Sequence, residues 1–193
     1  MELSPLCGIV FNMNITVYCG ANTGIRPAYI DEAKALGKWM AGKDHTLVYG
    51  GGRIGLMGVL ADEILAGGGK VVGVIPTFLA TAEKMHSMAT EMIEVATMSE
   101  RKNKMLEMGD CFVALPGGTG TLEEIAEAIS LMLLGRHDKP CILLNADGFY
   151  EPLKHMMDTM VKEGFLSQHA RDDILFAGSA EELARIIEEK ERA

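Results

Sequence analysis

A buried strand that ends in glycines and opens directly into a helix constrains this chain more than any other stretch. Residues 110–124 read DCFVALPGGTGTLEE, an apolar run that stops at Pro116 before two glycines and a Thr-Gly-Thr step. Small residues let backbone N–H groups approach an anion, and a helix N-terminus adds about half a positive charge. The stretch therefore predicts an anion site at a strand-to-helix junction.

The predicted helix begins with hydroxyl residues and carries carboxylates in its first turn. Thr119 and Thr121 can cap the helix or bind phosphate oxygens. Glu123 and Glu124 suit the helix dipole, and they also lie where a reaction beside a bound phosphate could use a carboxylate. Two interpretations stay open at this point, a simple helix-capping turn and a catalytic anion site.

Apolar strands alternate with helical patterns along the chain. Strand-like runs occupy residues 15–19, 46–49, 70–75, 92–96, 111–115 and 140–144, and helical spacing marks 27–43, a segment ending near 66, 99–109, 121–134, 149–163 and 180–190. Such apolar strands between helices indicate a parallel sheet covered on both faces. We predict one doubly wound, Rossmann-like α/β domain over residues 14–193, with about six or seven strands. Residues 1–13 lack periodicity and are predicted to be a disordered N-terminal extension.

Three glycine-rich loops fall at the predicted carboxyl ends of strands, where ligands bind in this fold: residues 20–24, 50–58 and 116–121. Residues 50–55 match the dinucleotide pattern GxGxxG, which is weak evidence alone. The acidic residue expected about 20 positions later is missing, because residues 65–81 contain no Asp or Glu. A Walker motif is also absent, since Val71 follows Gly69-Lys70. A mononucleotide or sugar phosphate fits these loops best.

The composition of the chain limits the kinds of binding partner that we expect. A net charge of −9 with 18 basic residues and no basic run argues against nucleic-acid binding. No apolar run approaches the ~20 residues of a membrane span, and the N-terminus lacks signal-peptide features. The four cysteines show no CxxC spacing and the five histidines no HExxH spacing, so we expect reduced thiols, no metal and a cytoplasmic location.

The PGGTGTLEE run at 116–124, the MSERK run at 98–102 and the glycine pattern at 50–58 together resemble the LONELY GUY family. Those proteins are phosphoribohydrolases of cytokinin riboside 5′-monophosphates that are often labelled lysine decarboxylases. The similarity spans about residues 15–153. It implies cleavage of a purine nucleoside 5′-monophosphate to free base and ribose 5-phosphate without a cofactor. It also implies a homodimer whose sites contain residues from both subunits.

The resemblance implies roles for individual residues. It makes Arg101 and Glu124 catalytic and places the substrate phosphate at Gly117, Gly118, Thr119, Gly120 and Thr121. The other substrate contacts that we predict are Gly20, Asn22, Glu83, Met98, Lys102, Glu123 and Ser130. For Lys102 and Glu83 plain solvent exposure is an alternative, and for Ser130 a bond to a carbonyl one turn back. The chain departs from the family pattern at Ser99, where His is common, and at 20–22, where Gly-Ser-Ser is common.

Breaking a ribose–base bond passes through an oxocarbenium-like state that an ionised carboxylate stabilises. We assign this role to Glu124, which we expect the helix dipole and Arg101 to keep ionised, with Arg101 as the orienting cation. The group that protonates the leaving base is not identified by the sequence. Two alternatives are a non-hydrolytic binder, since the fold resembles molybdenum-cofactor carriers, and a decarboxylase. The latter needs a lysine for pyridoxal phosphate, and the surroundings of Lys70, Lys102 and Lys139 do not suggest one.

Overall fold

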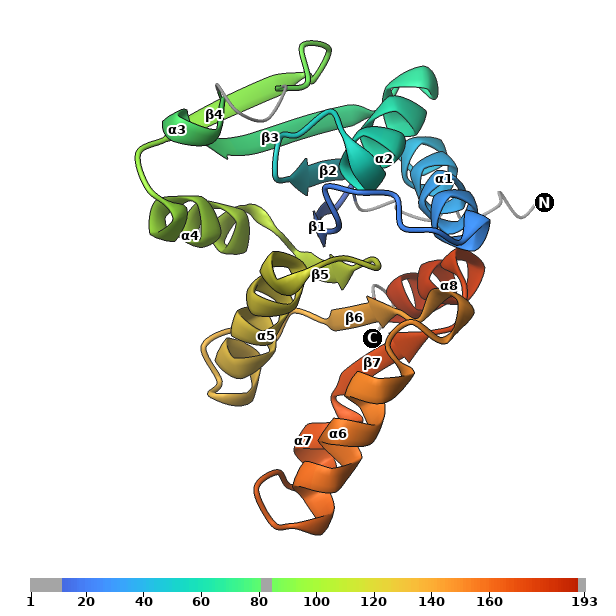
Figure 1. Cartoon of the computed structure of the whole chain (residues 1–193), viewed down its shortest axis with the longest axis vertical. Coiled ribbons are helices and arrows are strands. Elements are labelled where there is room, and N and C mark those ends of the chain that lie inside the picture. The colour runs from blue at the N-terminus through green and yellow to red at the C-terminus, as the bar shows by residue number, and fades with distance from the viewer. Residues whose placement is uncertain (1–11, 81–84, 191–193) are drawn as a thin grey trace, which may run out of the picture.

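The computed structural model describes residues 12–80 and 85–190, and it contains one seven-stranded sheet in which every strand pair is parallel (Figure 1). The strand order is β4-β3-β2-β1-β5-β6-β7. The strands are β1 (Asn14–Tyr18), β2 (Thr46–Tyr49), β3 (Lys70–Pro76), β4 (Glu91–Val95), β5 (Cys111–Ala114), β6 (Cys141–Leu144) and β7 (Ile174–Ala177). This confirms the predicted doubly wound α/β fold. The N-terminal extension predicted for residues 1–13 lies almost entirely outside the described residues.

Helices cover both faces of the sheet. They are α1 (Pro27–Gly42), α2 (Gly55–Ala66), α3 (Thr77–Ala80), α4 (Met98–Met108), α5 (Thr119–Leu133), the short 3-10 helix η1 (Ala146–Gly148), α6 (Glu151–Lys162), α7 (Gln168–Asp172) and α8 (Ala180–Lys190). Helices α1, α2 and α8 pack on one face, and α4, α5 and α6 on the other (Figure 1). Within the described ranges, none of the helices has the length and apolar character to cross a membrane.

Alternate residues of β1 pack into two separate hydrophobic clusters, one on each face of the sheet, as expected for a strand buried on both faces. Ile15 and Val17 point toward α1, α2 and α8, whereas Tyr18 packs with Phe112 beneath α4 and α5. The Tyr18 and Phe112 rings stack with centroids 6.4 Å apart. The central strand thus anchors both layers, and its carboxyl end is fixed from both sides.

The strand order reverses between β1 and β5, because β2, β3 and β4 extend to one side and β6 and β7 to the other. Connections leave these two neighbours in opposite directions, so a crevice opens at their carboxyl ends, where ligands bind in such folds. The loops 20–24 and 116–118 both begin there.

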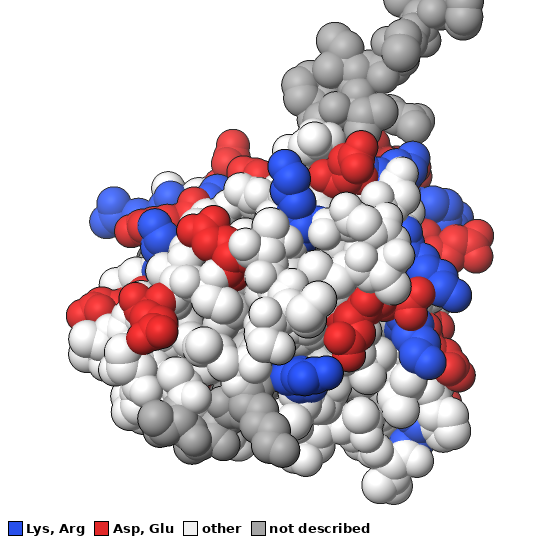
Figure 2. Space-filling model, turned by 90° about the horizontal axis from the view of Figure 1, so that it is seen from above, with Lys and Arg blue, Asp and Glu red and all other residues white. Residues whose placement is uncertain are grey.

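Acidic and basic side chains lie interspersed around the face shown in Figure 2, beside a broad area with neither. Among the described residues in that view the two signs of charge are mixed, without the cluster of basic side chains that binds a nucleic-acid backbone.

Candidate active site

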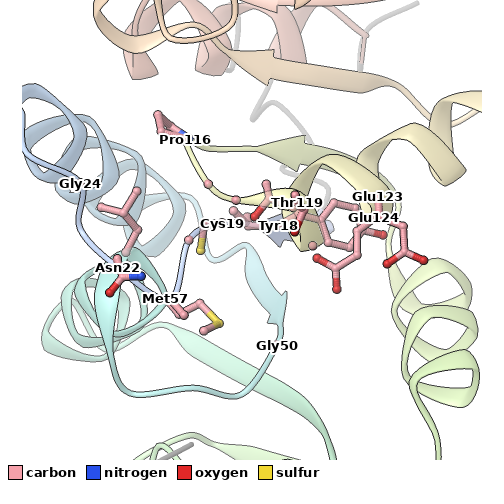
Figure 3. Close-up of a pocket in the computed structure, with 18 of the residues that line it drawn as sticks. Tyr18, Cys19, Asn22, Gly24, Gly50, Met57, Pro116, Thr119, Glu123 and Glu124 are labelled. Carbon is pink, nitrogen blue, oxygen red and sulfur yellow. The ribbon is translucent and has the colours of Figure 1, made fainter.

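A cavity of about 400 Å³ lies at the carboxyl ends of β1 and β5, between the loops after β1, β2 and β5 and the first turns of α4 and α5 (Figure 3). It contains most of the residues that the sequence had singled out. Those that line it are Gly20, Asn22, Met98, Arg101, Gly117, Gly118, Thr119, Gly120, Thr121, Glu123 and Glu124. Segments as far apart in the chain as Gly20 and Glu124 thus meet at the predicted edge of the sheet.

Backbone hydrogen bonds join the loops that form this cavity. The Gly20 N–H donates to the Pro116 carbonyl at 3.1 Å, and the Leu56 N–H donates to the Gly20 carbonyl at 3.0 Å. Gly117 is needed for close approach, because an added Cβ would lie 2.2 Å from Thr121 Oγ1. The backbone of these loops therefore forms the floor of the cavity, and the hydrogen bonds between the loops fix its position.

Helix α5 starts without a side-chain cap. Its N-cap is Gly118, and neither Thr119 nor Thr121 caps the helix. Because the first N–H groups of a helix have no partner inside the helix, those of α5 remain available to a ligand. Added Cβ atoms at Gly118 and Gly120 would meet nothing within 4 Å, so space lies beside this backbone. The geometry favours an anion site over a simple capping turn.

Arg101 is buried and held by backbone carbonyls. Its Nε donates to the Val74 carbonyl at 3.1 Å and its Nη2 to the Gly50 carbonyl at 3.0 Å. The helix that carries it begins with a variant of the capping box: the Glu100 N–H donates to Thr97 Oγ1 of the N-cap, and the Ala96 N–H, one residue before the N-cap, donates to a Glu100 carboxylate oxygen. Anchored at its base and at two of its nitrogens, the guanidinium presents a fixed positive charge at the cavity wall.

The Glu124 carboxyl points into the cavity, whereas that of Glu123 is turned toward α4 (Figure 3). Burial raises the pKa of Glu124 from 4.5 to about 7, and the positive charge of Arg101 only partly opposes this. Among the described residues no ion pair joins Glu124 to Arg101 within 4.0 Å. Burial therefore acts against the expectation that the helix dipole and Arg101 keep this carboxyl ionised.

Two predicted contacts among the described residues, Lys102 and Ser130, do not line the cavity. Lys102 Nζ lies 2.7 Å from Glu123 Oε1 and 3.0 Å from Glu127 Oε2, so it bridges two helices. The Ser130 hydroxyl donates to the Ala126 carbonyl at 2.7 Å, the bond one turn back that was its alternative role. Glu83 lies outside the described residues.

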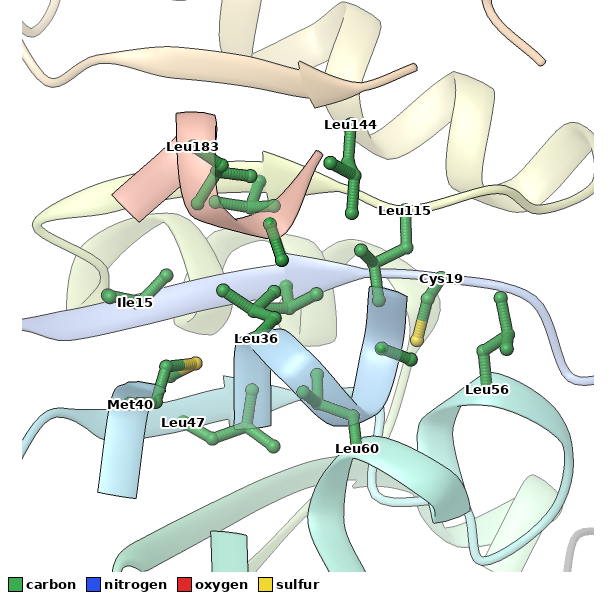
Figure 4. Packing of buried hydrophobic residues seen from close by; sticks show 14 of the residues in the cluster. Ile15, Cys19, Leu36, Met40, Leu47, Leu56, Leu60, Leu115, Leu144 and Leu183 are labelled. Atoms are coloured by element: carbon green, nitrogen blue, oxygen red, sulfur yellow. The ribbon is translucent and has the colours of Figure 1, made fainter. Parts of the chain in front are cut away.

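Several lining residues were not predicted. Tyr18 and Cys19 are buried at the end of β1, and Cys19 belongs to the same core cluster as Leu56 and Leu115 (Figure 4). Their place at a strand end before a glycine loop was a usable signal. Phe149 gave none: it reaches the cavity because Tyr150, its neighbour, donates its hydroxyl to the Leu115 carbonyl at 2.7 Å.

The parallel sheet with its reversal between β1 and β5 defines a Rossmann-like α/β protein. The uncapped helix N-terminus beside its cavity favours a small anionic ligand there. A family model described as "Possible lysine decarboxylase" matches residues 57–187. The chain belongs to this family.

Its relatives share most of its length. Cytokinin riboside 5′-monophosphate phosphoribohydrolase LOG3 of Arabidopsis thaliana is 45% identical over 175 residues, which are 91% of this chain and 81% of that protein. The phosphoribohydrolase LOG of Oryza sativa subsp. japonica is 46% identical over 175 residues, 91% of this chain and 72% of that protein. These matches confirm the family resemblance carried by the motifs.

A solved structure shares the fold at low identity. The molybdenum cofactor carrier protein of Chlamydomonas reinhardtii superposes with a TM-score of 0.71 and 21% identity, over 93% of this chain and 98% of that chain. At this identity the likeness shows the fold alone.

Proposed function

We propose that the protein is a phosphoribohydrolase that cleaves the N-glycosidic bond of a purine nucleoside 5′-monophosphate, with AMP and N6-substituted, cytokinin-type AMP as the substrate class. The observation that carries this proposal is the meeting of the uncapped α5 N-terminus, the Glu124 carboxyl and the Arg101 guanidinium in one cavity. The cytokinin riboside 5′-monophosphate phosphoribohydrolases at about 45% identity support it. The products are the free base and ribose 5-phosphate.

The phosphate would bind the backbone of residues 117–121 at the α5 N-terminus, where N–H groups and the helix dipole favour an anion. Because α5 begins at Thr119, Glu124 lies in its second turn, close to that end, and would face the ribose. Its carboxylate would stabilise positive charge at C1′ and O4′ and orient the attacking water. Arg101 would hold the substrate and supply a fixed positive charge.

A pKa of about 7 suits Glu124 to proton transfer near neutral pH, because a catalytic acid or base works best when its pKa lies near the operating pH. As the ionised form it can accept a proton from water. Bound substrate and the phosphate's negative charge would alter this pKa further. Activity should therefore fall below neutral pH, as the carboxylate becomes protonated.

The first prediction concerns these two side chains. Glu124→Gln and Arg101→Ala should each lower turnover at least ~100-fold, since each removes one preorganised charge. The measurement is chromatographic release of adenine or N6-substituted adenine from the 5′-monophosphate, with ribose 5-phosphate as the second product. Glu107→Gln, on the exposed side of α4, is the matched control and should stay near wild type. Near-normal turnover in either site variant would remove this mechanism.

A non-hydrolytic carrier of the same fold is the second candidate. The carrier structure at 21% identity shares the fold with this chain, and the likeness extends no further. Calorimetric titration with AMP beside the product assay separates the two. Binding without base release would favour the carrier.

The decarboxylase suggested by the family's description requires a lysine at the cofactor. No lysine lines the cavity within the described part of the chain. Lys139 Nζ instead donates to the Leu106 carbonyl at 3.2 Å, and Lys102 is held by its two carboxylates. The arrangement favours hydrolysis.

We also propose a cytoplasmic homodimer with shared sites. The buried thiols Cys19 and Cys141 fit a reducing compartment. The dimer contacts are assigned to the outer faces of α4 and α5. Leu122 on α5 and Leu134 directly after it are exposed.

A further inference from the structure

Lys102 bridges the two helices that carry the proposed catalytic pair. It follows Arg101 on α4, and its ammonium contacts Glu123 at 2.7 Å and Glu127 at 3.0 Å on α5. These carboxylates flank Glu124 at one position before it and three positions after it, so all three lie on neighbouring parts of the helix surface. One Glu127 carboxylate oxygen, Oε2, is fully buried, which makes its compensation by the ammonium important.

We propose that Lys102 is a positioning residue that sets the charge around Glu124, rather than a ligand of the substrate phosphate. By neutralising the two flanking carboxylates, it lets Glu124 ionise beside them. The proposal rests on the proposed function for its catalytic meaning, while its electrostatic content can be measured without turnover.

The ionisable groups that face Glu124 come from three elements. Helix α4 contributes Arg101 and Lys102, and α5 contributes Glu123 and Glu127. From β1 and the loop after it come Tyr18 and Cys19, whose pKa values burial and the Glu124 charge raise, so both stay neutral. The hydrogen bonds to Glu123 and Glu127 raise the pKa of Lys102, which keeps the ammonium charged.

These charges are balanced only while Lys102 is present. Two cations then oppose two flanking carboxylates around Glu124. Without Lys102, Arg101 alone opposes both, and a like charge nearby disfavours ionisation of a carboxyl. Removing Glu127 instead leaves an excess of positive charge. The two changes should therefore move the ionisation of Glu124 in opposite directions.

The test compares Lys102→Met, Glu127→Gln and the double variant by the pH dependence of kcat/KM on AMP. In Lys102→Met the acid limb should move to higher pH by roughly half a unit or more, less than the 1–3 units of a direct contact. In Glu127→Gln it should move to lower pH, and in the double variant it should lie between them. Lys104→Met, on the same helix, is the matched control and should leave the profile unchanged.

A purely structural role would lower activity at every pH without moving the limb, and a phosphate-binding role would raise KM for AMP with the limb unmoved. Either result would overturn the proposal. Carbon-13 carboxyl titration of the ligand-free protein, with the Glu124 signal assigned by its absence in Glu124→Gln, gives the same comparison without catalysis. If the Glu124 titration shifts in opposite directions in Lys102→Met and Glu127→Gln while no base is released, the electrostatic role of Lys102 stands and the proposed function fails. If the Glu124 titration does not shift in these variants, the electrostatic role fails whatever the turnover.

Discussion

Burial of the Glu124 carboxyl in an open cavity has a cost in stability. Its pKa in the folded protein, about 7, lies above the ordinary 4.5, so the folded state holds a proton that the unfolded state has released between these values. Below about pH 4.5 the carboxyl is protonated in both states, and its burial does not lower the stability of the fold. This stability is lost as the pH rises through 7, because the buried carboxyl must then ionise. Above neutrality the protein therefore folds with a destabilised ionised carboxyl at the centre of its site.

Glu124→Gln should in consequence be more stable than the wild type at about pH 8, by up to about 3 kcal/mol, and nearly equal to it at about pH 4.5. For a chain of this size that gain corresponds to several degrees in Tm, on the order of 2–4 °C per kcal/mol. Thermal unfolding followed by circular dichroism at the two pH values measures it. The exposed Glu107→Gln should show no such pH-dependent gain, and equal Tm changes at both pH values in Glu124→Gln would contradict the raised pKa.

The loop after β2 positions Arg101 through a single peptide carbonyl, and the glycine that provides it has no room for a side chain. A Cβ on Gly50 would lie 2.0 Å from Arg101 Nη2. The next carbonyl, that of Gly51, accepts from the N–H of the buried His86, whose ring Nε2 lies 3.0 Å from Asp62 Oδ1. The loop is thus pinned on its other side and cannot easily retreat from a new methyl group.

Gly50→Ala should therefore displace the guanidinium and lower turnover by about 10- to 100-fold, part of the effect of losing the charge altogether. Far-UV circular dichroism should stay that of the wild type, because Gly50 does not need a positive φ. Gly42→Ala is the matched control, since a Cβ there meets nothing within 4 Å. Undiminished turnover in Gly50→Ala would show that Arg101 does not need its observed position.

Long apolar strands and the glycine-rich loops were predictable because their signals are local. Six strands follow from runs such as KVVGVI and PCILL, and the loops follow from their glycines. Strand β7 and helix α7 were missed. Helix α7 has only five residues and falls in the predicted polar loop around residues 167–173, and β7 follows it directly.

The chemistry of individual site residues was harder to predict, because it depends on packing between distant segments. The ion pairs of Lys102 exist only because α4 lies against α5, and Phe149 reaches the cavity only because Tyr150 is bonded to the Leu115 carbonyl. Likewise, the helix dipole and Arg101 are visible as motifs, but the burial that raises the pKa of Glu124 is not.

Assembly decides whether Ser130 can take part in a site, because its hydroxyl lies outside the cavity of its own chain. Ser130 is exposed on α5 in a row of residues four apart that begins at Leu122 and ends at Leu134, which are 43% and 72% exposed. Residues four apart form a continuous ridge on a helix, the surface through which helices pack. A homodimer formed along this ridge would cover both leucines and bring Ser130 against the partner.

Leu134→Glu should therefore convert a dimer of about twice the 20.9 kDa chain mass into a monomer, because it places a charge in an apolar contact. Light scattering after size exclusion at the assay concentration measures the mass, and base release by the same samples shows whether the shared site is lost with the dimer. Phe165→Glu is the matched control, since Phe165 is 87% exposed but lies after α6, away from the ridge. A wild-type chain that elutes as a monomer, or a Leu134→Glu chain that stays dimeric, would move the interface elsewhere and leave Ser130 with only its bond to Ala126.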